Sequence, residues 1–76
     1  MPQHLADREI GVRAAEEVLR LFPNLSERAI AKRFGFNRKT IGNWKSGMTP
    51  SGYAIAVLYY AGCDIHYILT GRRGRS

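Results

Sequence analysis

The sequence has few of the residues that catalysis, metal binding or covalent cross-linking require. Its 76 residues include one cysteine, Cys63, and two histidines, His4 and His66, that are far apart along the chain. A single cysteine cannot form an internal disulfide, so packing alone must hold the fold, as is usual in a reducing cytosol. Because no cysteine or histidine spacing fits a metal site and the acidic residues lack a partner base, we expect no enzyme activity, metal, cofactor or small-molecule substrate.

Long hydrophobic runs and linkers are also missing. The longest apolar run, residues 53–63, is shorter than the roughly 20 residues that span a bilayer, and the N-terminus lacks a basic stretch followed by an apolar one. The basic residues fall among short segments rather than on one long amphipathic helix, so a membrane-surface role is not expected either. We expect a cytoplasmic protein with one domain, residues 1–71, and a loose basic tail, residues 72–76.

The formal net charge of +6 is distributed unevenly. Residues 1–27 contain three basic and five acidic side chains. Residues 28–45 contain no acidic side chain and six basic ones, which are Arg28, Lys32, Arg33, Arg38, Lys39 and Lys45. Such a run is typical of a surface that binds a polyanion, although a solvated basic face would have the same composition.

Apolar spacing predicts five helices and no strand, and therefore an all-α fold. The expected spans are residues 7–22, a stretch after Ser26 that ends at residue 34, residues 37–46, residues 50–61, and a short helix after Asp64. Side chains that can cap the free amides at the helix starts are Ser26, Asn37, Thr49 and Asp64. Glycines that can end helices in a left-handed turn are Gly35, Gly47, Gly62 and Gly71.

The third predicted helix, residues 37–46, has one apolar and one polar side. Ile41 and Trp44 define the inward side; at 100° per residue, the residues that point away are Lys39, Gly42, Asn43 and Ser46, with Arg38 on the flank. Arginine and lysine can donate to guanine and asparagine can pair with adenine, so this side suits base contacts in a DNA major groove. The prediction requires Lys39 and Asn43 to be exposed and Trp44 to be buried.

Gly42 is unexpected on an exposed helix face, where glycine costs about 1 kcal/mol relative to alanine. Close approach of the helix backbone to DNA would favour glycine at this position. Relief of packing inside the protein and neutral drift are the alternative explanations.

Residues 25–47, with the sequence LSERAIAKRFGFNRKTIGNWKSG, resemble the helix-turn-helix of the lambda-repressor and Cro family. Ala31 stands where the family keeps a small residue at the helix crossing, Gly35 where the turn needs glycine, and Ile41 and Trp44 where the second helix is anchored. Residues 62–71, GCDIHYILTG, are similar to the closing segment of many phage repressor amino-terminal domains. The resemblance extends from about residue 7 to residue 71 and implies a compact five-helix DNA-binding domain.

The resemblance further implies a phage-type transcriptional regulator, repressor or Cro-like, whose recognition helix enters the major groove of double-stranded DNA. The implied base contacts are Arg38, Lys39 and Asn43. The implied DNA backbone contacts are Ser26, Arg28, Asn37, Thr40, Lys45, Ser46 and Thr49. Since one recognition helix reads only a few base pairs, we expect a homodimer on a palindromic operator with two half-sites.

Two positions depart from the family pattern. Many members have glutamine where this chain has Glu27, and a carboxylate there would repel phosphate unless Arg28 or Arg38 neutralises it. Glu27 is therefore not assigned to the site. The residues before Asp7 contain no basic side chain apart from His4, so we do not expect the family's extended minor-groove arm.

The alternative function is a protein-interaction module on the same fold, such as the antitoxin of a toxin pair. The fourth predicted helix is apolar on nearly every side, so it is either central in the fold or partly committed to a partner. Four tyrosines would suit a surface for another protein or for a second copy, namely Tyr53, Tyr59, Tyr60 and Tyr67. They could equally be half-buried core residues.

Overall fold

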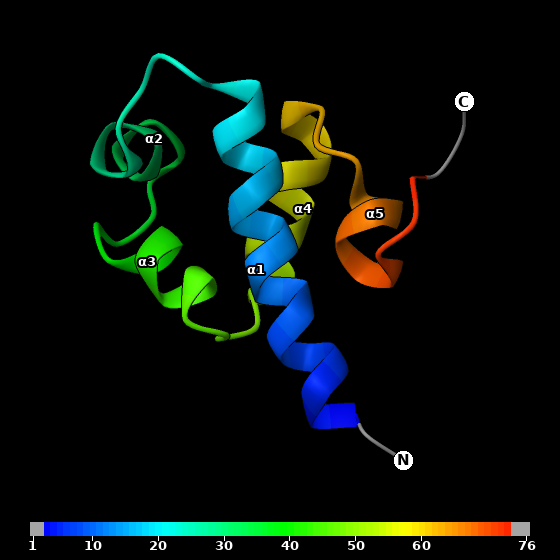
Figure 1. The fold of residues 1–76 in the computed structure, drawn as a ribbon. Helices are drawn as coiled ribbons and strands as arrows, with labels where there is room; N and C mark the ends of the chain where they lie inside the picture. Colours follow the sequence, from blue (N-terminus) through cyan, green and yellow to red (C-terminus); the bar gives the residue numbers. More distant parts are fainter. Residues whose placement is uncertain (1–2, 74–76) are drawn as a thin grey trace.

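A computed structural model describes the backbone of residues 3–73 and the side chains of residues 9–73. Within these residues it contains five helices and no strand, so the all-helical fold is confirmed. The helices are α1 (Gln3–Leu21), α2 (Glu27–Phe34), α3 (Thr40–Lys45), α4 (Gly52–Ala61) and α5 (Ile65–Thr70). The long helix α1 runs through the middle, with α2 and α3 on one side of it and α4 and α5 on the other (Figure 1).

The core is shared by α1 to α5: α3 and α5 pack closely on α1, α2 packs on α3 and α4 on α5, and each helix contributes at least one fully buried aliphatic side chain. These side chains are Val18, Ile30, Ile41, Leu58 and Ile68. Full burial of such a side chain contributes roughly 1.5–3 kcal/mol. Helices of six to ten residues are not stable alone in water, so this shared core holds α2 to α5 in place.

Several helix ends lie where the capping residues predict them. The Ser26 hydroxyl accepts a hydrogen bond from the Ala29 amide (3.1 Å), and Asp64 accepts one from the Tyr67 amide (2.9 Å). Gly35 ends α2 with a φ of +76°, in the left-handed region that favours glycine. Local sequence alone therefore defines both ends of α2 and the start of α5.

Three predicted helix starts are wrong. The first helix begins at Gln3 rather than at residue 7, so it is about one turn longer at its start than predicted. The third helix begins at Thr40 rather than at Asn37, whose side-chain oxygen instead accepts from the Lys39 amide (2.8 Å) and forms a turn. The fourth helix begins at Gly52, because Ser51 rather than Thr49 caps it through a bond from the Ala54 amide (3.1 Å).

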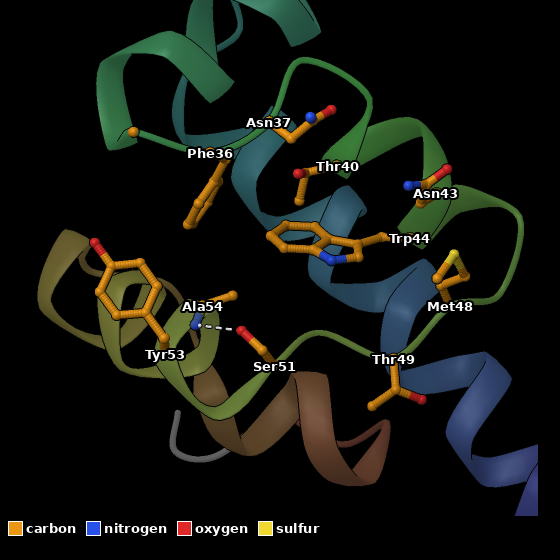
Figure 2. Close-up of a pocket in the computed structure, with 11 residues that line it drawn as sticks. Phe36, Asn37, Thr40, Asn43, Trp44, Met48, Thr49, Ser51, Tyr53 and Ala54 are labelled. Carbon is orange, nitrogen blue, oxygen red and sulfur yellow. Dashed lines mark hydrogen bonds between the residues drawn. The ribbon is translucent and has the colours of Figure 1, made fainter.

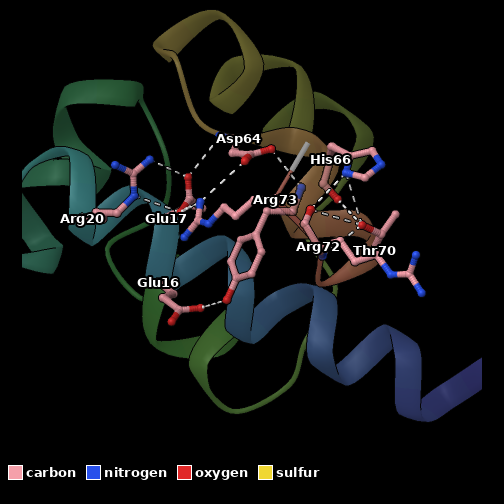
Figure 3. Close-up of polar contacts among 9 residues, drawn as sticks. Glu16, Glu17, Arg20, Asp64, His66, Thr70, Arg72 and Arg73 are labelled. Carbon is pink, nitrogen blue, oxygen red and sulfur yellow. Dashed lines mark hydrogen bonds and ion pairs between the residues drawn. The ribbon is translucent and has the colours of Figure 1, made fainter. Parts of the chain in front are cut away.

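A buried carboxylate, Glu17, ties α1 to the C-terminal part of the fold (Figure 3). It accepts hydrogen bonds from the guanidinium of Arg20 (2.9 and 3.0 Å), from the backbone amide of Asp64 (3.1 Å) and from Arg73 Nη1 (2.7 Å). The bonds from Arg20, followed by those from Asp64 and Arg73, outweigh desolvation and lower the pKa of Glu17 from 4.5 to about 2.

The expectation of a loose tail is wrong for the part of it that the structure describes. The Arg73 guanidinium lies over the ring of Tyr67, 3.9 Å from its centroid, in addition to its bond to Glu17. The backbone amide of Arg72 donates to the Thr70 hydroxyl (3.1 Å). The chain after α5 is therefore folded back onto α1 and α5 as far as residue 73.

The lowered pKa of Glu17 predicts an acid-sensitive fold. Because the folded-state pKa lies below the ordinary value, ionised Glu17 stabilises the fold fully above pH 4.5, and this stability is lost as the pH falls toward 2. We expect Glu17→Gln to lower the free energy of unfolding at pH 7 by about 3 kcal/mol and to flatten its decline below pH 4.5, measured by urea denaturation across pH. Glu9→Gln, at an exposed carboxylate 3.8 Å from Arg13, is the control and should change little. An unchanged acid decline in Glu17→Gln would contradict this role.

The middle of α1 packs closely against the end of α3 and the loop after it at Gly11. A Cβ atom there would lie 2.9 Å from the Trp44 carbonyl oxygen and closer still to that of Met48. We expect Gly11→Ala to lower the free energy of unfolding by about 1–3 kcal/mol, although alanine is the better helix former. Gly42→Ala is the matched control, because its Cβ would meet only Glu27 Oε1 at 3.9 Å. If chemical denaturation gave both variants equal or higher stability than the parent, α1 would not be confined at Gly11.

Candidate nucleic-acid interface

The short helix α3 has one buried and one exposed side. Ile41 is fully buried and Trp44 is 3% exposed, whereas Lys39, Gly42 and Asn43 are exposed. Figure 2 shows the Trp44 indole pointing down from α3 toward α4, while Asn43 lies on the outer edge. The two conditions set from the sequence, a buried tryptophan and accessible Lys39 and Asn43, are therefore confirmed.

The turn between α2 and α3 fixes the relative direction of the two helices. The Phe36 amide donates to the Ala31 carbonyl (2.8 Å), and Ala31 itself is fully buried. The Phe36 ring then packs edge-on against Trp44, with 5.6 Å between ring centroids. Gly35 has open space around its Cβ position, so its left-handed backbone rather than packing explains the glycine.

Glu27 is neutralised by Lys45 rather than by Arg28 or Arg38, the two residues that the sequence suggested for this role. Lys45 Nζ lies 2.7 Å from Glu27 Oε2, and this ion pair links the first turn of α2 to the last residue of α3. Both side chains are partly exposed, so the pair is worth only about 0–1 kcal/mol. Its larger effect is to reduce the charge that Lys45 can offer to an anion. Sequence spacing gave no indication of this contact, because 18 residues separate the partners.

The predicted site residues fall into two groups. Asn37, Thr40 and Asn43 lie in a row along one edge of a cleft of about 370 Å³, whereas Thr49 lies across the cleft beyond Met48 (Figure 2). Trp44 and Ala54 are the buried residues among those that line the cleft, and no Asp, Glu, Lys, Arg or His lines it. The remaining site residues are exposed around α2 and α3, namely Ser26, Arg28, Arg38, Lys39, Lys45 and Ser46.

Internal hydrogen bonds limit what some of these side chains can do. The Ser46 hydroxyl already donates to the Asn43 carbonyl (2.9 Å), so its proton is not available to a phosphate oxygen. The oxygen of the Asn37 side chain is held by the Lys39 amide, which leaves its NH₂ group as the donor. The Ser26 hydroxyl accepts the capping bond from Ala29 and keeps its proton for another acceptor.

Gly42 has no packing reason to be glycine. The nearest atom to a Cβ at this position, outside its own helix, is Glu27 Oε1 at 3.9 Å, an ordinary contact distance. Relief of internal packing, one of the three explanations of this glycine, is therefore wrong, and neutral drift stays as the alternative to close approach of DNA. What the glycine does provide is an exposed helix backbone without a side chain in front of it.

Other kinds of site have little support among the described residues. Their histidines, cysteine and carboxylates include no group of three that could hold a metal ion. Burial, and then the nearby charge of Glu17, raise the pKa of the Cys63 thiol to about 11, so the thiolate is scarce at neutral pH. None of the described helices combines the length and apolar character that crossing a membrane requires.

No family model, curated protein or solved structure matches this chain with significance.

Proposed function

We propose that the protein is a transcriptional regulator, of the phage repressor or Cro type, that binds double-stranded DNA through a helix-turn-helix formed by α2, the turn at Gly35 and α3. The single observation that carries the proposal is the two-sidedness of α3. Ile41 and Trp44 anchor it inside the protein, and the residue types on the polar side that remains, together with those just before the helix, suit a major-groove reader. Such a protein acts where the DNA is, in the cytoplasm.

The lack of ion-pair partners among the described residues for most basic residues of α2 and α3 supports this proposal. Of the six basic side chains from Arg28 to Lys45, only Lys45 has a carboxylate partner within the described part of the chain. Two acidic residues of α1 are instead paired with other cations, Glu9 with Arg13 and Glu17 with Arg20 and Arg73. An uncompensated basic surface around α2 and α3 favours a polyanionic ligand.

The proposal assigns base contacts to Arg38, Lys39 and Asn43, and backbone contacts to the donors around them. Gly42 supports the same orientation, because an exposed backbone without a side chain lets a helix come close to DNA. Ser46 has the smallest share, since its hydroxyl proton is used within the helix. The DNA backbone contacts are then Ser26, Arg28, Asn37, Thr40, Lys45 and Thr49; Ser46 joins them only if its hydroxyl turns its proton from the Asn43 carbonyl to a phosphate, because the DNA backbone offers acceptors and no donor.

Specific and non-specific contacts predict different mutant behaviour. We expect Asn43→Ala or Arg38→Ala to cost about 1–3 kcal/mol on the preferred sequence, selected beforehand from a random duplex pool, and to relax preference at one position. Lys45→Ala should weaken binding to preferred and random duplexes alike and flatten the salt dependence. Anisotropy titrations of both duplexes at several salt concentrations measure these effects.

Glu27→Gln is the matched control, because it releases Lys45 and removes a negative charge from the same place. It should strengthen binding to every duplex. If Asn43→Ala and Lys45→Ala reduced affinity for preferred and random DNA by the same factor, the assignment of base contacts to α3 would be wrong.

The exposed side of α4 gives the proposal its second part, the homodimer. Tyr53, Tyr59 and Tyr60 are 67%, 62% and 85% exposed, so the explanation of them as half-buried core is wrong. Tyr67 is instead occupied within the protein, because its hydroxyl donates to Glu16 (2.6 Å). Residues 46–63 carry no charge on a chain of net charge +6, so this is the surface at which two copies can approach without mutual repulsion.

We expect Tyr59→Ser with Tyr60→Ser to weaken self-association by about tenfold or more without changing the unfolding transition, since large exposed aromatic side chains dominate interfaces. Sedimentation equilibrium measures the association. Tyr67→Phe is the control and should leave the association unchanged, because that ring is half-buried and its hydroxyl is used by Glu16 (2.6 Å). A wild-type chain that stays monomeric, retains no DNA and captures a different protein would favour the interaction-module alternative, which the same tyrosines also suit.

A further inference from the structure

A second hollow lies beside α2, and its lining is basic. It has a volume of about 450 Å³ and is lined by Arg28, Ala29, Lys32, Phe36 and Arg38. Arg28 and Lys32 are four residues apart on α2 and so share one face of that helix. Arg38 comes from the turn that precedes α3, so the groove joins the two halves of the proposed helix-turn-helix. We call these five residues the basic groove.

The three cations of the basic groove have no ion-pair partner among the described residues. The adjacent acid in sequence, Glu27, is held by Lys45 and does not line the groove. Arg28 and Lys32, four residues apart on one helix face, repel each other by a few tenths of a kcal/mol, although Lys32 in the last turn gains from the helix dipole. This arrangement is expected where an external anion compensates the charge.

Phe36 gives the basic groove a fixed apolar wall. Its ring is half-buried and lies 5.8 Å from Phe34 and 5.6 Å from Trp44, measured between centroids. Because Trp44 is the anchor of α3, the groove and the exposed side of α3 are held in one rigid arrangement. A ligand that lies along α3 and passes Arg38 therefore meets the groove directly.

We infer that the basic groove holds the DNA sugar-phosphate backbone next to the bases contacted by α3, with Lys32 as a phosphate contact in addition to Arg28. The inference rests on the proposed function and extends its contact surface along the outer face of α2. An acidic segment of another protein would suit the same charges. The DNA backbone is favoured because Arg28 and Arg38 belong to both the groove and the proposed DNA interface, so one continuous polyanion can satisfy both.

Two neighbouring cations on α2 allow a matched test. Lys32→Gln and Arg33→Gln each remove one exposed positive charge, but the Arg33 guanidinium lies over the Phe22 ring, 5.7 Å from its centroid, and does not line the groove. The slope of log affinity against log salt is measured for wild type and both variants on a random-sequence duplex. We expect Lys32→Gln to reduce the slope by about 0.9, the value for one lost phosphate contact, and Arg33→Gln to leave it unchanged. Lys32→Arg should keep the wild-type slope.

Equal slopes in Lys32→Gln and Arg33→Gln would overturn the inference, because the effect would then be one of net charge alone. If Lys32→Gln bound DNA like wild type while Asn43→Ala lost sequence preference, the groove contact would be wrong and the proposed function would stand. Poly-glutamate that bound wild type but not Lys32→Gln, without displacing DNA, would assign the groove to an acidic protein partner. A wild-type chain that retained no duplex at low salt would remove the inference and the proposed function together.

Discussion

The burial of Ile41 and Trp44 beneath α3 is the constraint on which the rest of the structure depends. A helix of six residues cannot hold its own direction in water, so its exposed side is defined only by what its other side contacts. Trp44 provides that contact through Phe36 and through the close approach of Gly11 on α1 to the end of α3. The orientation of Asn43 and Lys39 is therefore a property of the core and not of α3 alone.

Local signals explain why much of the fold could be predicted from the sequence. A capping oxygen and a left-handed glycine act on amides a few residues away, so Ser26 and Gly35 located α2 correctly. The same signals misplaced the start of α4, where Thr49 and Ser51 are both good caps on either side of a proline. Propensity cannot choose between two adequate caps, and tertiary packing of the loop decides.

The features that the sequence could not predict are contacts between distant positions. Glu17 is an ordinary helix glutamate in the sequence, and only the fold brings Arg73 and the start of α5 to it. The same holds for the ion pair of Glu27 with Lys45. In the candidate site, the exposed face of α3 followed from a 100° periodicity, whereas the partners of its flanking charges required the coordinates.

Because most of the described acidic side chains are paired away from residues 28–39, the net positive charge of the protein is concentrated in that segment. Glu16, Glu17 and Glu27 are satisfied within the described part of the chain by Tyr67, by two arginines and by Lys45. These contacts lie between α1 and the C-terminal part of the chain, within α1, or at the ends of the unit formed by α2 and α3. What remains uncompensated is concentrated between residues 28 and 39, next to the bases that α3 would contact. In the proposed function, charge there would strengthen binding to any phosphate backbone and Asn43 would add discrimination between bases, so the proposal assigns affinity and specificity to neighbouring but separable residues.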